Sequence, residues 1–168
     1  MELRGLTKMN LQQVIDYWIK PALEYFPPNL RTPNRVQFML GIGLIESGYR
    51  AVAQEPVADA FGYWQMERAT FNDCIDNFLA FSSPFTEGWF QLRDTHTVAY
   101  STLTYDCVFA CYMSAIKVYR APPEIPDLYD LKGMAEYWKQ YYNASPNGAS
   151  VDEAIARMQP MIQQNLEY

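Results

Sequence analysis

The sequence predicts an almost wholly helical protein, and three features of the chain support that prediction. Apolar residues recur at the three- and four-residue spacing of a helix face, and the alternation typical of strands is almost absent. Prolines and capping residues divide the chain into segments of helical length. One segment, 36–45, is apolar on nearly every side, which is typical of a helix buried at the centre of a protein. The expected fold class is all-α, with at most a minimal β-hairpin near 50–65.

The central helix has the clearest start and stop signals. Thr32 supplies a hydroxyl for the N-cap, and Pro33 follows at the position where proline suits the first turn of a helix. After Arg35, the first charged residue is Glu46, and Gly48 offers a stop two residues later.

Similar signals place the other helices. A first helix is expected over about 9–25, with Pro21 kinking or breaking it. Ser150 and Glu153 form a capping box for a last helix that ends near Asn165. Between these, the pattern predicts helices over about 67–81, 87–93, 97–119 and 130–143.

The chain is expected to form a single domain over residues 1–168. Its length is enough to bury a substantial core, and 49% of its residues are hydrophobic. No repeat, low-complexity tract or long linker divides it. We expect most of the aromatic residues, 15% of the chain, to fill that core.

The charge pattern excludes some classes of partner. The net charge is −6 and no run of lysine or arginine occurs, so the sequence predicts no nucleic-acid partner. Charged residues interrupt the apolar segments, which argues against membrane insertion. The first residues, MELRGLTKMNL, lack the apolar stretch of a secretion signal, which indicates synthesis in the cytoplasm.

The cysteines indicate free thiols in the core. Three of them, Cys74, Cys107 and Cys111, are an odd number for a disulfide framework. Cys107 and Cys111 are four residues apart on an apolar helical stretch, so they share one face. The only histidine, His96, is eleven residues from Cys107 and no CxxC occurs, so we expect no metal and no cofactor.

Glu46 is the leading candidate for a catalytic residue. It continues the apolar stripe of Met39 and Gly43, and it lies at the negative end of its own helix. Both surroundings raise the pKa of a carboxylic acid. The nearby sequence offers no cation to pair with the Glu46 carboxylate unless the Arg50 side chain folds back onto it. An acid that stays protonated near neutral pH can protonate a glycosidic oxygen. The alternative is a structural glutamate, capped by backbone amides or paired with Arg50.

Three pieces of the sequence resemble the core motif of soluble lytic transglycosylases and goose-type lysozymes. They are Glu46-Ser47-Gly48-Tyr49, then Ala60-Phe61-Gly62-Tyr63-Trp64-Gln65-Met66 followed by Ala69-Thr70, and Tyr141-Tyr142-Asn143 followed by Gly148. Their order matches the family's Glu-Ser, Gly-Leu-Met-Gln-Ile and Tyr-Asn-Ala-Gly elements, and they cover about residues 36–80 and 134–148. The chain looks most like bacteriophage members of this group. The resemblance implies a lysozyme-like fold with a buried central helix that ends at the catalytic glutamate.

The resemblance also implies an activity, the cleavage of peptidoglycan after N-acetylmuramic acid by a lytic transglycosylase or a muramidase. Glu46 would donate a proton to the β-1,4 glycosidic oxygen. It would then act as a base toward the sugar's 6-hydroxyl, giving a 1,6-anhydro product, or toward water.

Five further residues receive roles from the same resemblance. Ser47 would help to orient the catalytic carboxyl, and Gly62 would let the backbone approach the sugar closely. Gln65 would bind the substrate or hold the acid in place. Tyr142 would hydrogen-bond to the acid or position it, and Asn143 would bind the substrate nearby.

A second carboxylate is required by inverting and retaining glycosidases, but not by the lytic transglycosylase route. In that route the substrate's N-acetyl group can stabilise the oxocarbenium ion, and we favour it. Glu55, Asp59 and Glu67 are within reach in the sequence as candidates for a second acid. The loop of residues 51–59 departs from the family's small-residue pattern, and Arg68 replaces the proline usual before the Ala-Thr pair.

The expected partner is the glycan strand of peptidoglycan. An enzyme of this kind without a secretion signal would reach the wall as part of a phage virion or through a membrane opened by another protein. A second hypothesis is a catalytically silent virion protein of the same fold that binds glycan or another virion protein. The joint presence of Glu46, Gln65 and Asn143 favours the enzyme. A chitinase-like activity is a third option, and a nucleophilic hydrolase is disfavoured because no Gly-x-Ser-x-Gly occurs.

Overall fold

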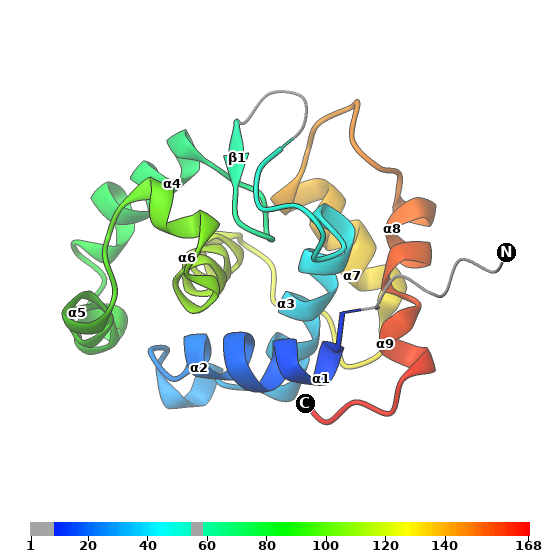
Figure 1. Cartoon of the computed structure of the whole chain (residues 1–168), viewed down its shortest axis with the longest axis horizontal. Helices are drawn as coiled ribbons and strands as arrows, with labels where there is room; N and C mark the ends of the chain where they lie inside the picture. The colour runs from blue at the N-terminus through cyan, green and yellow to red at the C-terminus, as the bar shows by residue number, and fades with distance from the viewer. Residues whose placement is uncertain (1–8, 55–58) are drawn as a thin grey trace, which may run out of the picture.

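The helix that the sequence predicts to be buried, α3 (Pro33–Glu46), runs through the middle of the protein (Figure 1). The computed structural model of the chain describes residues 9–54 and 59–168. Every α3 residue from Arg35 to Ile45 is buried, as expected for a helix that is apolar on nearly every side. Full burial ends at Glu46, whose side chain is half-buried.

The two ends of α3 differ in how well the sequence signals predict them. Pro33 occupies the first helical position as predicted, but the Thr32 side chain makes no capping hydrogen bond, so that part of the prediction is wrong. At the other end, Gly48 adopts a φ of +58° and its N–H donates to the carbonyl of Gly43 at 3.0 Å. Glycine at this left-handed position ends the helix, as expected.

The first helical segment continues through Pro21, so the break that was one of the two predicted outcomes does not occur. It consists of α1 (Leu11–Val14), a π-helical turn η1 (Ile15–Ile19) and α2 (Lys20–Leu23). In the wider turn, the N–H of Lys20 donates to the carbonyl of Ile15, five residues earlier. This spacing accommodates a proline that has no N–H to donate and whose ring crowds the preceding turn.

The helix predicted over 97–119 is two elements. A 3-10 helix, η5 (Tyr100–Thr104), comes first, and α6 (Cys107–Arg120) follows. The separation arises because Asp106 adopts an extended conformation and its carboxylate accepts a hydrogen bond from the N–H of Phe109 at 2.9 Å. Asp106 is therefore an N-cap, a signal that the long apolar pattern concealed.

The remaining elements follow the predicted order. They are η2 (Pro28–Leu30), α4 (Arg68–Cys74) with η3 (Ile75–Leu79), η4 (Ser83–Phe85), α5 (Thr86–Thr95), α7 (Leu131–Tyr137) with η6 (Trp138–Tyr142), α8 (Val151–Met158) and α9 (Pro160–Gln163). The capping box of Ser150 and Glu153 at the start of α8 is confirmed. Strands β1 (Ala60–Phe61) and β2 (Met66–Glu67) pair antiparallel, with Ala60 opposite Glu67. The prediction of a mostly helical protein with a minimal hairpin is confirmed.

The helices surround α3 on several sides (Figure 1). In this view α4, α5 and α6 lie to its left, α7, α8 and α9 lie to its right, and the segment from α1 to α2 passes below. The β-hairpin lies at the top, toward the end of α3 that carries Glu46. Buried apolar side chains from all of these helices form one core cluster. No helix within the two described ranges is long and apolar enough to cross a membrane.

The packing at the end of α3 gives a first testable prediction. A Cβ at Gly43 would collide with the phenol of Tyr49, whose hydroxyl donates to the carbonyl of Leu40 at 3.1 Å. Gly43→Ala should therefore destabilise the protein by about 2 kcal/mol, the usual result of overpacking. At Gly41 the added Cβ meets the flexible ends of two methionine side chains, Met158 at 2.9 Å and Met161 at 3.3 Å.

Gly41→Ala is the matched control, because the same change in the same helix should be close to neutral. Alanine is the better helix former by about 1 kcal/mol, which offsets a small rearrangement of Met158. Chemical denaturation of the two variants measures the difference. Equal stability of Gly43→Ala and Gly41→Ala would contradict the tight fit of Tyr49.

Candidate active site

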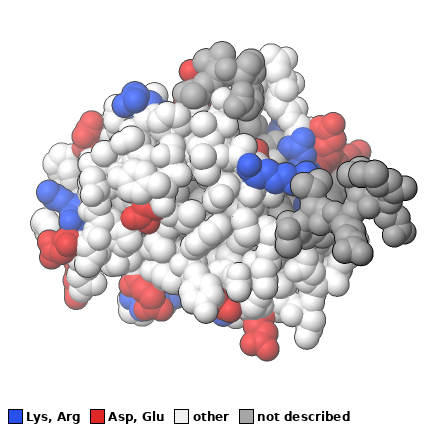
Figure 2. All heavy atoms as spheres, in the orientation of Figure 1, with Lys and Arg blue, Asp and Glu red and all other residues white. Residues whose placement is uncertain are grey.

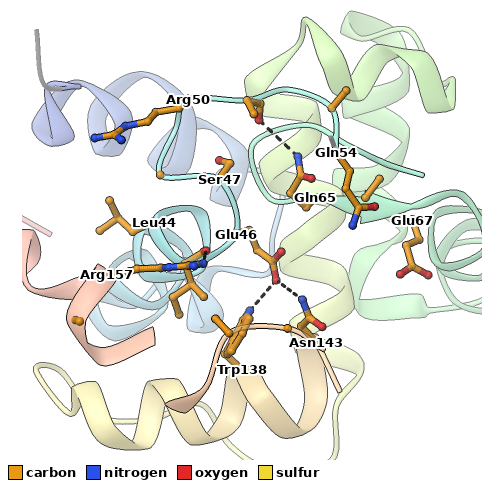
Figure 3. A pocket seen from close by; sticks show the side chains of 18 of the residues that line it. Leu44, Glu46, Ser47, Arg50, Gln54, Gln65, Glu67, Trp138, Asn143 and Arg157 are labelled. Carbon is orange, nitrogen blue, oxygen red and sulfur yellow. Dashed lines mark hydrogen bonds between the residues drawn. The ribbon is translucent and has the colours of Figure 1, made fainter. Parts of the chain in front are cut away.

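The end of α3 opens into a cavity of about 750 Å³. Its wall comes from the end of α3, the segment that follows it, the β-hairpin, the region of η6 and the helices α8 and α9 (Figure 3). The polar and charged side chains that line it are Glu46, Ser47, Arg50, Gln54, Gln65, Glu67, Trp138, Asn143 and Arg157. Segments far apart in the sequence thus meet around a single carboxyl group.

The carboxyl of Glu46 is held through one of its two oxygens. Oε1 accepts a hydrogen bond from the indole Nε1 of Trp138 at 2.7 Å and a longer one from the side-chain amide of Asn143 at 3.4 Å (Figure 3). Within the described ranges, Oε2 has no donor. One oxygen is therefore fixed by N–H groups, and the other is available to a ligand in the cavity.

Both donors come from one π-helical turn. Trp138 begins η6 and Asn143 follows its last residue, and the N–H of Asn143 donates to the carbonyl of Trp138 at 2.8 Å. In a π turn, residues five apart come together, whereas an α-helix brings together residues three or four apart. The wider turn is what places both side chains at the same carboxyl.

The pKa of Glu46 lies above its ordinary value because burial removes water from the carboxylate. The hydrogen bonds from Trp138 and Asn143, and the positive charges of Lys117 and Arg157, lower the pKa in part without cancelling that effect. Direction and main cause agree with what the sequence suggests. The described residues make no ion pair to Glu46, and Arg50 does not fold back onto it.

Tyr142 does not bond to Glu46. Its buried hydroxyl donates to the carbonyl of Trp64 at 2.7 Å, and the indole of Trp64 donates to the carbonyl of Met39 at 2.8 Å. The hydrogen-bonding role expected of Tyr142 belongs to Trp138. Tyr142 therefore connects η6 to the hairpin loop. The ammonium group of Lys117 donates a hydrogen bond to the main-chain carbonyl of Tyr142 at 2.7 Å.

Ser47 lines the cavity, but its hydroxyl acts on the backbone. It donates to the carbonyl of Tyr63 at 2.7 Å and accepts from the N–H of Tyr49 at 3.1 Å. The end of α3 is thereby joined to the hairpin loop. Ser47 influences the carboxyl through the position of the helix end, without touching it.

Gln65 lies on the wall of the cavity, in the uncommon left-handed conformation with a φ of +51°. Its side-chain nitrogen donates to the carbonyl of Gly62 at 2.9 Å and to that of Ala51 at 3.5 Å. Its side-chain oxygen accepts no hydrogen bond from the described residues. Gln65 is therefore suited to bind a ligand and does not hold Glu46.

Gly62 does not line the cavity, so its expected role as a point of close approach to the sugar is corrected. A Cβ at this position would lie 2.8 Å from the carbonyl oxygen of Leu103 and 3.2 Å from Ala110. The residue also has a φ of +77°. Glycine is required here by the turn and by packing against Leu103, because any side chain would strain both.

The candidates for a second acid differ in their position relative to the cavity. Glu67 lines the same cavity and lies across it from Glu46 (Figure 3). Asp59 is exposed and is not part of the cavity wall. Glu55 lies outside the described residues. Of the two candidates that the structure describes, only Glu67 shares the cavity.

Sequence reasoning missed Trp138 and Arg157. Trp138 stands five residues before Asn143, a spacing that α-helical periodicity does not select. Arg157 lies on α8 and its guanidinium donates to the carbonyl of Ile45 at 2.7 Å, a contact across 112 positions. No local signal in the sequence predicts such a contact. No set of three or more His, Cys, Asp or Glu side chains in the described part of the chain is placed to hold a metal ion.

The Trp138 hydrogen bond gives a second prediction. The N–H stabilises the ionised carboxylate, so Trp138→Phe should raise the pKa of Glu46 further and keep the acid protonated to higher pH. An NMR titration of the Glu46 carboxyl carbon measures this directly. Trp89→Phe, which removes a buried indole in α5, should leave the titration unchanged. A Glu46 titration that does not move in Trp138→Phe would show that the bond is absent in solution.

No protein-family model matches the chain, and neither a curated protein nor a solved structure matches it.

Proposed function

We propose that the protein is a peptidoglycan-cleaving glycosidase with a lysozyme-like fold, in which Glu46 is the general acid and base. The observation that carries the proposal is the state of this carboxyl: its pKa is raised, one oxygen is held by N–H donors, and the other is available in an open cavity. The sequence resemblance supplies the substrate, the bond between N-acetylmuramic acid and N-acetylglucosamine. It also suggests a phage protein that acts on the host wall from the virion or at lysis.

The geometry suits both halves of the reaction. Burial raises the pKa of Glu46 and so favours its protonated form, in which Oε2 can carry the proton that the glycosidic oxygen receives. Once the proton has left, the N–H groups of Trp138 and Asn143 stabilise the carboxylate that remains. That carboxylate then accepts a proton from the sugar's 6-hydroxyl or from water. The residues that hold Oε1 need not move between the two steps.

We favour the lytic transglycosylase route, which yields the 1,6-anhydro product. Glu67, the only second-acid candidate on the described cavity wall, is exposed and makes no hydrogen bond to a described residue. A base or nucleophile is normally held in place by such bonds. Internal attack by the 6-hydroxyl needs no second carboxylate, so Glu46 serves as acid and base in turn.

The principal test uses purified peptidoglycan and mass analysis of the released muropeptides. The native protein should release anhydro-muropeptides, and Glu46→Gln should lower the rate by about 10²- to 10⁴-fold, the usual contribution of a general acid. Glu136→Gln, on the exposed side of α7, is the matched control and should keep the native rate. Absence of any product from the folded native protein on several wall types would refute the proposal.

Replacement of Glu67 separates the two routes. Under the transglycosylase route, Glu67→Gln should keep its rate within about threefold and still release anhydro products, since an exposed side chain without a catalytic role contributes little. Under a hydrolytic route, the same change should abolish most activity, and the native products should carry reducing ends. The mass of the products and the rate of the variant must agree for either conclusion.

A further inference from the structure

The cavity that contains Glu46 is unevenly charged. Arg50 and Arg157 lie on one side of it, whereas Gln54 and Glu67 lie on the other (Figure 3). On the face shown in Figure 2, a group of basic side chains lies right of centre beside acidic ones, and other basic side chains lie toward the left edge; the whole chain has a net charge of −6. The positive charge on the side of Arg50 and Arg157 is thus local, and it is opposite in sign to the net charge of the protein.

Neither arginine is neutralised by an acid of the described chain. Arg157 donates to the carbonyl of Ile45, and Arg50 is exposed and forms no ion pair or side-chain hydrogen bond with a described residue. Among the other described arginines, Arg31 pairs with Glu24 at 2.9 Å and Arg120 pairs with Asp73 at 2.6 Å, whereas Arg35, Arg68 and Arg93 form no ion pair. The two cavity arginines therefore offer unshared N–H donors to a ligand. An arginine fork matches a carboxylate best.

The position of Arg157 relates this charge to the reacting sugar. Its guanidinium is bound to the carbonyl of Ile45, the residue directly before Glu46. In peptidoglycan, the sugar whose C1 reacts is N-acetylmuramic acid, and its peptide stem leaves through the lactyl ether on C3 of the same ring. A side chain anchored beside the acid therefore lies near the base of the stem. The stem carries free carboxylates, whereas the sugars themselves are neutral.

We propose that Arg50 and Arg157 bind the carboxylates of the peptide stem, so that the protein selects wall glycan whose stems carry free carboxylates. The inference rests on the proposed function and goes further, because it names which form of the polymer is the substrate. A neutral polymer such as chitin would leave both guanidinium groups without a negative charge to bind. The loss of those charge-assisted hydrogen bonds should weaken its binding.

The test compares two substrates of equal glycan length, intact strands and the same strands after their stem carboxylates have been converted to neutral amides. The native protein should cleave the intact strands about tenfold faster or more, as one charged hydrogen bond permits. Arg50→Gln should reduce that ratio several-fold, and Arg50→Gln combined with Arg157→Gln should bring it near one. Arg93→Gln is the control, because Arg93 is exposed on α5, on the other side of α3 from α8 (Figure 1), and should keep the native ratio.

A binding assay distinguishes failure of this inference from failure of the proposed function. Glu46→Gln protein should retain intact strands more tightly than strands with amidated carboxylates, and added salt should reduce the difference. Equal cleavage and equal binding of the two substrates would overturn the inference and leave the glycosidase proposal standing. Arginine variants that lose the same factor on both substrates would also overturn it, since they would show a structural role. If nothing is cleaved, the glycosidase proposal fails, and the binding preference alone decides the role of the arginines.

Discussion

The hydrogen bond between the Trp138 indole and the Glu46 carboxyl is the interaction on which the rest of the site depends. A carboxyl at the end of a helix buried among apolar side chains needs a donor that does not neutralise it. Lysine or arginine at that distance would hold it ionised, whereas an indole N–H can bond to either protonation state. The bond spans 92 positions and joins α3 to η6. The packing of these two helices therefore also sets the position of the Trp138 donor relative to the Glu46 carboxyl.

Side chains that never touch the carboxyl fix its surroundings through backbone oxygens. Tyr142 bonds to the carbonyl of Trp64, Ser47 bonds to that of Tyr63, and Lys117 bonds to that of Tyr142. These bonds join α3, the hairpin loop, α6 and η6, which are the segments that meet around the acid. All three bonds run from a side chain to a main-chain oxygen, so none of them uses the side chains of Gln65, Arg50 or Glu67 on the cavity wall.

The sequence predicted the features that depend on local patterns and missed those that depend on distant contacts. Burial of α3, its end at Gly48 and the raised pKa of Glu46 follow from apolar periodicity and from one charged residue at its end. Two features depend on π turns: the first helical segment continues through Pro21, and Trp138 and Asn143 both reach the Glu46 carboxyl. A 3.6-residue period cannot reveal such turns, because the extra residue shifts the face that each helix presents. A side-chain capping bond to the backbone, such as that of Asp106, was likewise hidden by the apolar residues around it.

Under the proposed function, the charge at the cavity would link the choice of substrate to the protonation state of Glu46. Arg157 lowers the pKa of Glu46, so in the free protein it opposes the protonated form that the first step requires. A stem carboxylate bound to Arg157 would cancel that charge and remove an opposing influence. The pKa of Glu46 would then rise when the correct polymer is in place and would stay lower when a neutral glycan occupies the cavity. Selection would therefore act on catalysis as well as on binding, because the same arginine contributes to both.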